Sequence, residues 1–185
     1  MINYPSGFKK EKNKKLTSYK NRGLRFEDEI NQTNKYYLDK DLALIYKKPT
    51  PIHVVKYSSK NNRISDAYYE VKSTTDYNGI YRGKYIDFDA KSTLLKTSFP
   101  LDNIKSFQLE HLKKVVLHGG IGFIFINFKT IDEYYILTIQ KILDYTENNS
   151  RKSIPYSFIK ENGIKVERKL NPPLDYLSAL DSLVE

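Results

Sequence analysis

The residues of this chain best suited to chemistry are Asp76, Asp89 and Lys91, all within the segment STTDYNGIYRGKYIDFDAK. Side chains alternate between the two faces of a strand, so Asp87, Asp89 and Lys91 are expected on one face. Asp89 and Lys91 would lie about 7 Å apart, or two strand rises, a spacing that lets their charged ends straddle one phosphate. Asp76 followed by Asp89-x-Lys91 is the D…(D/E)-x-K pattern of metal-dependent nucleases.

The same segment predicts the hairpin that would bring these groups together. It reads as the end of one strand, a turn carrying Gly79 and Gly83, and a second strand over 84–91, whose apolar residues Ile86 and Phe88 face inward. Asp76 returns to the second strand if this hairpin forms. Spacing alone leaves an alternative open, an exposed hairpin whose charges serve solubility, because short motifs have many false positives.

Two polar residues on predicted helices are further candidates for this site. In a helix predicted over 24–38, Glu27 lies three residues before the apolar Ile30, so it is either a satisfied core group or a site residue. In a helix predicted over 103–118, Gln108 lies at the edge of the buried stripe, where its amide is placed to face the central strand. Taken alone, Glu27 fits either interpretation equally well. Beside the metal-nuclease pattern a site residue is favoured, so Glu27 joins Asp76, Asp89 and Lys91 as a catalytic candidate.

Composition predicts a single basic domain. The chain has 185 residues and a formal net charge of +9, which favours a polyanionic partner. Residues 1–21 are predicted to be a disordered basic arm, and 22–185 a single domain. Seven Lys and Arg residues between Lys9 and Arg22 are opposed there only by Glu11, although such a run can also be a solubilising tail.

Features that the sequence lacks limit the expected cellular location and the kinds of active site. Without cysteine there is no disulfide framework and no Cys zinc site, which fits a reducing compartment. The apolar run over 115–128 is too short to span a bilayer, so we expect a cytoplasmic protein with no membrane segment. The three histidines are scattered, which argues against a histidine metal site. No Gly-Lys-Ser/Thr follows the central turn, which argues against NTP hydrolysis.

The segment 58–72 precedes the central hairpin and is placed to protrude from the body. Its Lys60, Arg63, Tyr68 and Tyr69 combine charge with aromatic rings, a composition suited to nucleic acid because rings stack on exposed bases. The alternative is a solvated loop with two partly buried tyrosines.

The remaining elements predict a mixed α/β domain. Strands are expected over 41–48, 52–57, 121–128 and 134–139, and helical stretches over 141–145 and 156–161. Apolar residues after Pro172-Pro173 predict a terminal amphipathic helix.

Several separate strings, in order, carry a resemblance to a known family. They are YPSG, NRGLRFEDEINQTNKYYL, KKPTP, STTDYNGIY-x-G-x-YIDF-x-AK, KTSFPL and Q-x-EH, and the likeness runs over about residues 3–128 and weakly to PPLDYL. In these residues the chain resembles the RecU family of Holliday-junction resolvases.

The resemblance implies a homodimeric, Mg²⁺-dependent endonuclease acting in homologous recombination and DNA repair. Members make paired symmetric nicks across four-way junction DNA and are linked to strand-exchange recombinase and branch-migration proteins. The implied fold is a restriction-endonuclease-like α/β core, a mixed central sheet flanked by helices, with a protruding stalk. The implied cofactor is one or two Mg²⁺ ions, with Mn²⁺ as a substitute.

The resemblance also assigns roles by position. Thr74, Asp76, Asp89 and Gln108 match the metal-binding set, and Lys91 matches the transition-state stabiliser. By the same comparison Glu27 lies near the site, the stalk corresponds to 58–72, and the arm, which ends near Arg22, corresponds to a DNA-binding extension.

Two departures from the family pattern set the alternatives. Asp89 stands where the family usually has Glu, and the stalk is shorter and differs in sequence. A structure-selective DNA-binding or strand-annealing protein with a weakened nuclease site is therefore one alternative. A related nuclease acting on forks or duplex is the other.

Overall fold

The core of the protein is a six-stranded mixed sheet. The computed structural model describes residues 19–69 and 74–184, with side chains from Arg25 onward, so the predicted arm lies outside the described residues up to position 18. In spatial order the strands are β1 (Leu44–Lys47), β4 (Tyr77–Tyr81), β5 (Lys84–Thr93), β7 (Ile121–Phe128), β8 (Glu133–Thr138) and β10 (Ile164–Val166). Only β5 and β7 pair in parallel, because the chain crosses over between them, and the other neighbours are antiparallel.

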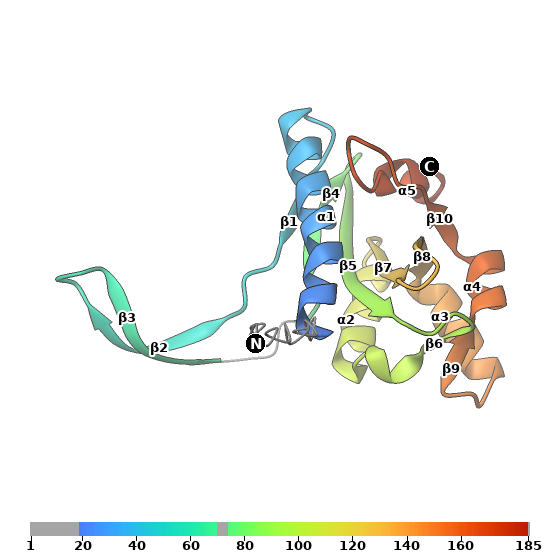
Figure 1. Ribbon diagram of the computed structural model, residues 1–185, viewed down its shortest axis with the longest axis horizontal. Helices are drawn as coiled ribbons and strands as arrows, with labels where there is room; N and C mark the ends of the chain where they lie inside the picture. The colour runs from blue at the N-terminus through green and yellow to red at the C-terminus, as the bar shows by residue number, and fades with distance from the viewer. Residues whose placement is uncertain (1–18, 70–73, 185) are drawn as a thin grey trace, which may run out of the picture.

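Helices cover both faces of this sheet (Figure 1). One face carries α1 (Tyr19–Asp39) and α5 (Tyr176–Val184), and the other carries α2 (Ser106–Leu117), α3 (Ile139–Asn148) and α4 (Tyr156–Asn162). The expected α/β class with a mixed central sheet flanked by helices is confirmed. No helix in the described ranges is long and apolar enough to cross a membrane.

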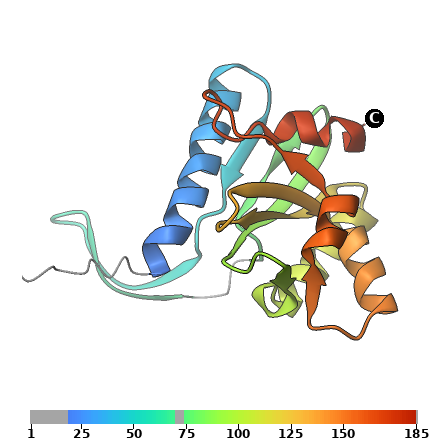
Figure 2. The same cartoon turned by 45° about the vertical axis from the view of Figure 1, so that its right-hand side comes forward.

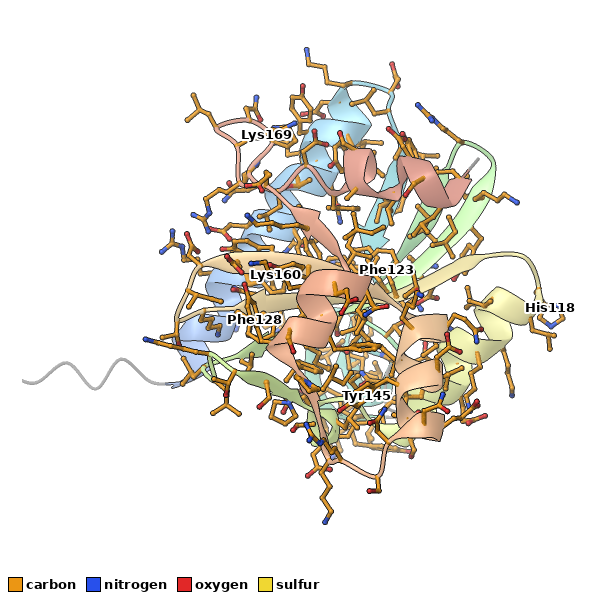
Figure 3. All side chains as sticks on the ribbon, turned by 90° about the vertical axis from the view of Figure 1, so that its right-hand side faces the viewer. His118, Phe123, Phe128, Tyr145, Lys160 and Lys169 are labelled. Carbon is orange, nitrogen blue, oxygen red and sulfur yellow. The ribbon has the colours of Figure 1, made fainter. Side chains whose placement is uncertain are left out.

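The alternation of side chains along the central strands builds two hydrophobic layers. Phe88 and Phe123 stack under α1 and α5, with ring centroids 4.7 Å apart. On the other face, Ile124 and Phe128 pack with Tyr145 of α3 (Figure 3). Because apolar residues of β5 fill the first layer, the polar residues between them must point toward α2.

Most predicted elements exist, with shifted ends. Helix α1 begins at Tyr19 rather than Leu24, and β7 has the predicted bounds. The short strands β6 (Ser98–Pro100), β9 (Ser153–Pro155) and β10, and a 3₁₀ turn over Leu101–Asn103, were not expected, because three residues are too few to show a period.

A separate β-hairpin projects from the body (Figures 1 and 2). Strands β2 (Ile52–Ser58) and β3 (Arg63–Tyr69) pair only with each other in the described part of the chain, and nearly every residue in them is exposed. The protruding stalk is therefore confirmed. It begins at Ile52 rather than at 58, and positions 70–72 of the predicted segment lie outside the described residues.

Candidate active site

The predicted hairpin of the central motif is present as β4 and β5. Tyr77 pairs with Phe88, and the two-residue turn consists of Arg82 and Gly83, both with positive φ, as tight hairpins require. The placement of Gly79 in the turn was wrong. It lies within β4, where a Cβ atom would come within 2.0 Å of the Leu44 carbonyl oxygen in β1.

This hairpin brings Asp76 to Asp89 and Lys91. Asp76 immediately precedes β4, and its Oδ2 accepts a hydrogen bond of 3.2 Å from the backbone N–H of Ala90 in β5. Asp89 and Lys91 form an ion pair on the face of β5 that points toward α2. The three residues of the D…D-x-K pattern therefore meet at one place.

The Asp89 carboxylate is buried and poorly compensated. The Lys91 ammonium pairs with its Oδ2 and alone balances its charge, and no other described donor is hydrogen-bonded to either oxygen. Burial, followed by the nearby negative charge of Asp76, raises the pKa of Asp89 from 3.8 to about 7, while Lys91 acts in the opposite direction. A buried carboxyl with a single charged partner, next to a second carboxylate, is the arrangement that a bound cation relieves.

The donor set fits a hard divalent cation. No group of three His, Asp or Glu side chains among the described residues is placed to hold a metal. The predicted set does not need one, because it combines two carboxylates with neutral oxygens, and Mg²⁺ is commonly held by one or two carboxylates together with water and substrate phosphate. Asp76 and Asp89 meet that requirement.

The two neutral members of the predicted metal set come from the loop before Asp76 and from α2. Thr74 is exposed in the loop before Asp76, where its Oγ1 receives a long contact of 3.4 Å from Lys48 Nζ. Gln108 is buried in the first turn of α2, and its Oε1 accepts a hydrogen bond of 3.0 Å from the backbone N–H of Lys105. That oxygen already caps the helix, so the roles of Thr74 and Gln108 as ligands stay predictions.

Sequence reasoning missed the cluster around Asp87. This residue is buried beside Asp89 on the same face of β5, and Lys48, Thr75, Tyr85 and His111 all contact its carboxylate. A signal was available, because Lys48 lies in the string KKPTP and His111 in Q-x-EH, the strings that flank the central motif. His118, which caps the C-terminal end of α2, is exposed at the surface instead (Figure 3).

Glu27 lies near the site but across the sheet. Its Oε2 pairs with Lys47 Nζ at 2.6 Å, and its backbone carbonyl accepts a long hydrogen bond from the Tyr77 hydroxyl. Burial raises the pKa of Tyr77, and the negative charges of Glu27 and Asp76 add to that effect. Both carboxylates are therefore close enough to interact electrostatically with the Tyr77 hydroxyl. A catalytic role for Glu27 stays a prediction.

The predicted DNA-binding residues of the stalk are all exposed. Lys60 lies in the turn and Arg63 begins β3, while Tyr68 and Tyr69 are 57% and 77% exposed. The alternative of two partly buried tyrosines is therefore wrong. The side chain of Arg22, within α1, is outside the described side chains.

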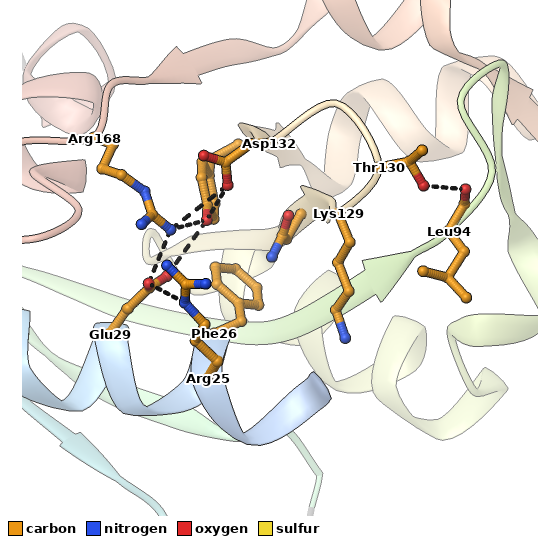
Figure 4. Close-up of a pocket in the computed structure, with 10 residues that line it drawn as sticks. Arg25, Phe26, Glu29, Leu94, Lys129, Thr130, Asp132 and Arg168 are labelled. Atoms are coloured by element: carbon orange, nitrogen blue, oxygen red, sulfur yellow. Dashed lines mark hydrogen bonds and ion pairs between the residues drawn. The ribbon is translucent and has the colours of Figure 1, made fainter. Parts of the chain in front are cut away.

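A cavity of about 440 Å³ lies away from this chemistry, between α1 and the β7–β8 turn (Figure 4). Its rim is an ion-pair network in which Glu29 joins Arg25 and Arg168, and Arg168 also reaches Asp132. None of the predicted catalytic or metal-binding residues lines it. The site formed by Asp76, Asp89 and Lys91 is thus separate from this cavity.

Comparison with known proteins finds relatives that match nearly the whole chain. A curated protein of Oenococcus oeni is 47% identical over 195 residues, covering 99% of this chain and 98% of that protein. One of Leuconostoc citreum is 45% identical over 200 residues, covering 100% and 98%, and one of Bacillus cereus is 44% identical over 175 residues, covering 91% and 88%. All three are named Holliday junction resolvase RecU.

A solved structure was also matched, that of Hjc, a Holliday junction resolvase of Archaeoglobus fulgidus. The TM-score is 0.45 at 12% identity, over 85% of this chain and 95% of that one. The family model described as Recombination protein U matches residues 21–182. With a family match and relatives that both cover nearly its whole length, this chain belongs to the RecU family.

Proposed function

We propose that this protein is a Mg²⁺-dependent endonuclease that resolves Holliday junctions by paired symmetric nicks during homologous recombination and repair. The observation that carries the proposal is the buried Asp89 carboxylate, paired with Lys91 and next to Asp76, in a chain of the RecU family. A restriction-endonuclease-like organisation of the core belongs to the same proposal. It is supported by a mixed sheet in which β5, one strand of the central parallel pair with β7, carries Asp89 and Lys91.

The roles of the residues follow from their positions. The backbone N–H of Ala90 fixes one oxygen of Asp76 and leaves the other for a ligand. Asp89 contributes oxygens that accept no other hydrogen bond within the described structure. Lys91, whose ammonium lies beside them, is placed to stabilise negative charge that develops on a phosphate in the transition state.

Mg²⁺ held by these carboxylates would bind the scissile phosphate, lower the pKa of a bound water and offset charge on the leaving oxygen. One ion or two, with Mn²⁺ as a substitute, are compatible with this donor set. Because the pKa of Asp89 is raised to about 7, part of the protein would carry a proton there at neutral pH, and Asp89 would lose that proton when it holds a cation.

The stalk supplies a surface for the junction. Adjacent residues of a strand point to opposite faces, so Tyr68 and Tyr69 present one ring on each face at the base of the hairpin. The positive charges of Lys60 and Arg63 lie at its other end, in and next to the turn. A two-stranded hairpin is marginally stable on its own, so a partner surface is expected to support it. Junction DNA satisfies that need.

A homodimer is part of the proposal because paired symmetric nicks need two active sites. A two-fold protein matches a target that is cut at two related points. Contacts with recombinase and branch-migration proteins, and a cytoplasmic location, stay predictions from the resemblance.

The test is nicking of a labelled four-way junction in Mg²⁺, with a fork and a linear duplex at equal concentration. Wild-type protein should make paired symmetric nicks in the junction. Asp76→Asn should lose cleavage by more than about 100-fold while it keeps junction affinity, since electrostatic and metal contacts of this kind supply several kcal/mol to the transition state. Continued cutting by Asp76→Asn contradicts the site, and cutting of all three substrates alike contradicts the junction assignment.

A further inference from the structure

The buried carboxylate of Asp87 is the centre of a polar cluster that the proposed chemistry does not use. Its Oδ1 accepts a short hydrogen bond from the Thr75 hydroxyl. Its Oδ2 contacts Lys48 Nζ at 2.7 Å, the Tyr85 hydroxyl at 2.9 Å and His111 Nε2 at 2.8 Å. Both oxygens are therefore occupied, whereas Asp89 has Lys91 as its one partner, so Asp87 has no free oxygen for a metal ion.

The cluster holds the loop that carries Asp76. The backbone N–H of Lys48 donates to the Asp76 carbonyl at 2.8 Å, and its ammonium donates to Thr75 Oγ1 at 2.6 Å and, more weakly, to Thr74. The same ammonium forms the ion pair with Asp87. Lys48 thus fixes three consecutive residues of the loop, and Asp87 fixes Lys48.

The cluster also holds helix α2 against the sheet. His111 lies one turn after Gln108 on α2, and its ring nitrogen reaches the Asp87 carboxylate on β5. The Tyr85 hydroxyl, which also contacts Asp87, accepts a hydrogen bond of 3.1 Å from Asn78 Nδ2 in β4. The loop, the strands β4 and β5, and the helix all meet at this one side chain.

We propose that Asp87 is a positioning residue that sets the geometry of the metal site through Lys48 and His111. This inference rests on the proposed function and goes beyond it, because it assigns a role to residues outside the D…D-x-K pattern. A buried carboxylate is costly unless its charge and hydrogen bonds are satisfied. Here Thr75, Tyr85 and His111 come from segments that carry a candidate ligand, and Lys48 binds the loop of Asp76. Partners of this kind, one step removed from a metal, typically change its affinity or the activity by about 10- to 100-fold.

The first experiment compares Asp87→Asn with wild type in two assays. Direct titration with Mn²⁺ in the absence of DNA should give an affinity weaker by about 10- to 100-fold. Junction nicking should need correspondingly more Mg²⁺ for its half-maximal rate, and the rate at saturating Mg²⁺ should stay close to that of wild type. Asp144→Asn is the matched control, because Asp144 is an exposed carboxylate on α3, far from the site, and both quantities should be unchanged.

A second pair of variants separates positioning from simple loss of packing. His111→Leu fills similar space but cannot donate to Asp87, and it should show the same weaker Mn²⁺ affinity. His111→Gln places an amide N–H near the position of the imidazole Nε2 and should restore most of the affinity. Since His111 is only partly buried, both variants are expected to fold, and they decide the question if Asp87→Asn does not.

Two results would overturn the inference. One is wild-type Mn²⁺ affinity in Asp87→Asn and His111→Leu. The other is loss of nicking at every Mg²⁺ concentration with unchanged Mn²⁺ affinity, which would make Asp87 a catalytic residue. If wild-type protein binds Mn²⁺ but does not nick junctions, the proposed function fails, and the Mn²⁺ titrations still decide the role of Asp87.

Discussion

Replacing Asp89 by Asn is expected to abolish cleavage and, at the same time, to stabilise the metal-free protein at alkaline pH. The shift in the pKa of Asp89 from 3.8 to about 7 means that the folded state disfavours the ionised carboxylate. At about 1.4 kcal/mol per pKa unit, ionised Asp89 lowers the free energy of unfolding at pH 8 by up to about 4 kcal/mol. Asp89→Asn should recover this amount, reduced by the free energy that the variant loses because Lys91 is left unpaired. That is a large share of the 5–15 kcal/mol by which domains are usually stable.

The sign of the pH dependence follows from linkage. Because the folded-state pKa is the higher one, the neutral carboxyl of Asp89 supports the fold fully below pH 3.8, and this support is lost as the pH rises toward 7. Asn cannot ionise, so the stability difference between the two proteins should be small near pH 4 and should grow up to pH 8.

Urea unfolding in EDTA, followed by circular dichroism at pH 4, 6 and 8, measures this difference directly. Adding Mg²⁺ at pH 8 should stabilise wild type and leave Asp89→Asn unchanged, since only the carboxylate gains from the cation. A variant that is less stable than wild type at pH 8, or a difference that does not vary with pH, would refute the reasoning.

Three further predictions concern the stalk, the sheet and the core. Tyr69→Ala should weaken junction binding by about 1–3 kcal/mol, the usual value for a base stacked on an aromatic side chain. It should leave the urea midpoint unchanged because the ring is exposed. Competition binding with junction and duplex DNA measures both the affinity and the selectivity. Gly79→Ala should detach β1 from β4, since the new methyl group meets backbone atoms of β1, and hydrogen exchange of the β1 amides would report the loss. Phe88→Ala should cost about 3–5 kcal/mol in the free energy of unfolding, because it empties a fully buried aromatic site, and a midpoint like that of wild type would contradict the stacked core.

The sequence was most informative where a hydrophobic pattern extended over many residues or where several motif residues lay close together. The nearly continuous apolar run of β7 predicted its bounds, and the alternation in β5 correctly separated the face of Phe88 from the face of Asp89. The hairpin that returns Asp76 to Asp89 was also predictable, because the turn residues lie between two strand patterns. These features depend on neighbours in sequence.

What the sequence did not reveal depends on contacts between distant segments. The alternation of apolar and polar residues in β5 indicated that Asp87 and Asp89 share a face of the sheet. It did not indicate that both would be buried, or that Lys48 would pair with Asp87. The stalk was expected as a polar insertion, since a hairpin without a buried face lacks the apolar alternation that marks most strands. Gly79 was assigned to the turn because the sequence does not distinguish two reasons for a glycine. One is close packing against a neighbouring strand, as at Gly79, and the other is a positive φ, as at Gly83.

The two buried aspartates of β5 show how neighbours, rather than residue type, assign function. Asp87 and Asp89 have the same side chain, strand, face and burial. Four donors surround Asp87, so its charge is fully compensated within the protein. Asp89 has Lys91 and, nearby, the like charge of Asp76, so a cation improves its surroundings while it would only compete with the partners of Asp87. We therefore expect the shorter acid at position 89 to allow a metal site, because the loop held by Lys48 brings the second carboxylate to it.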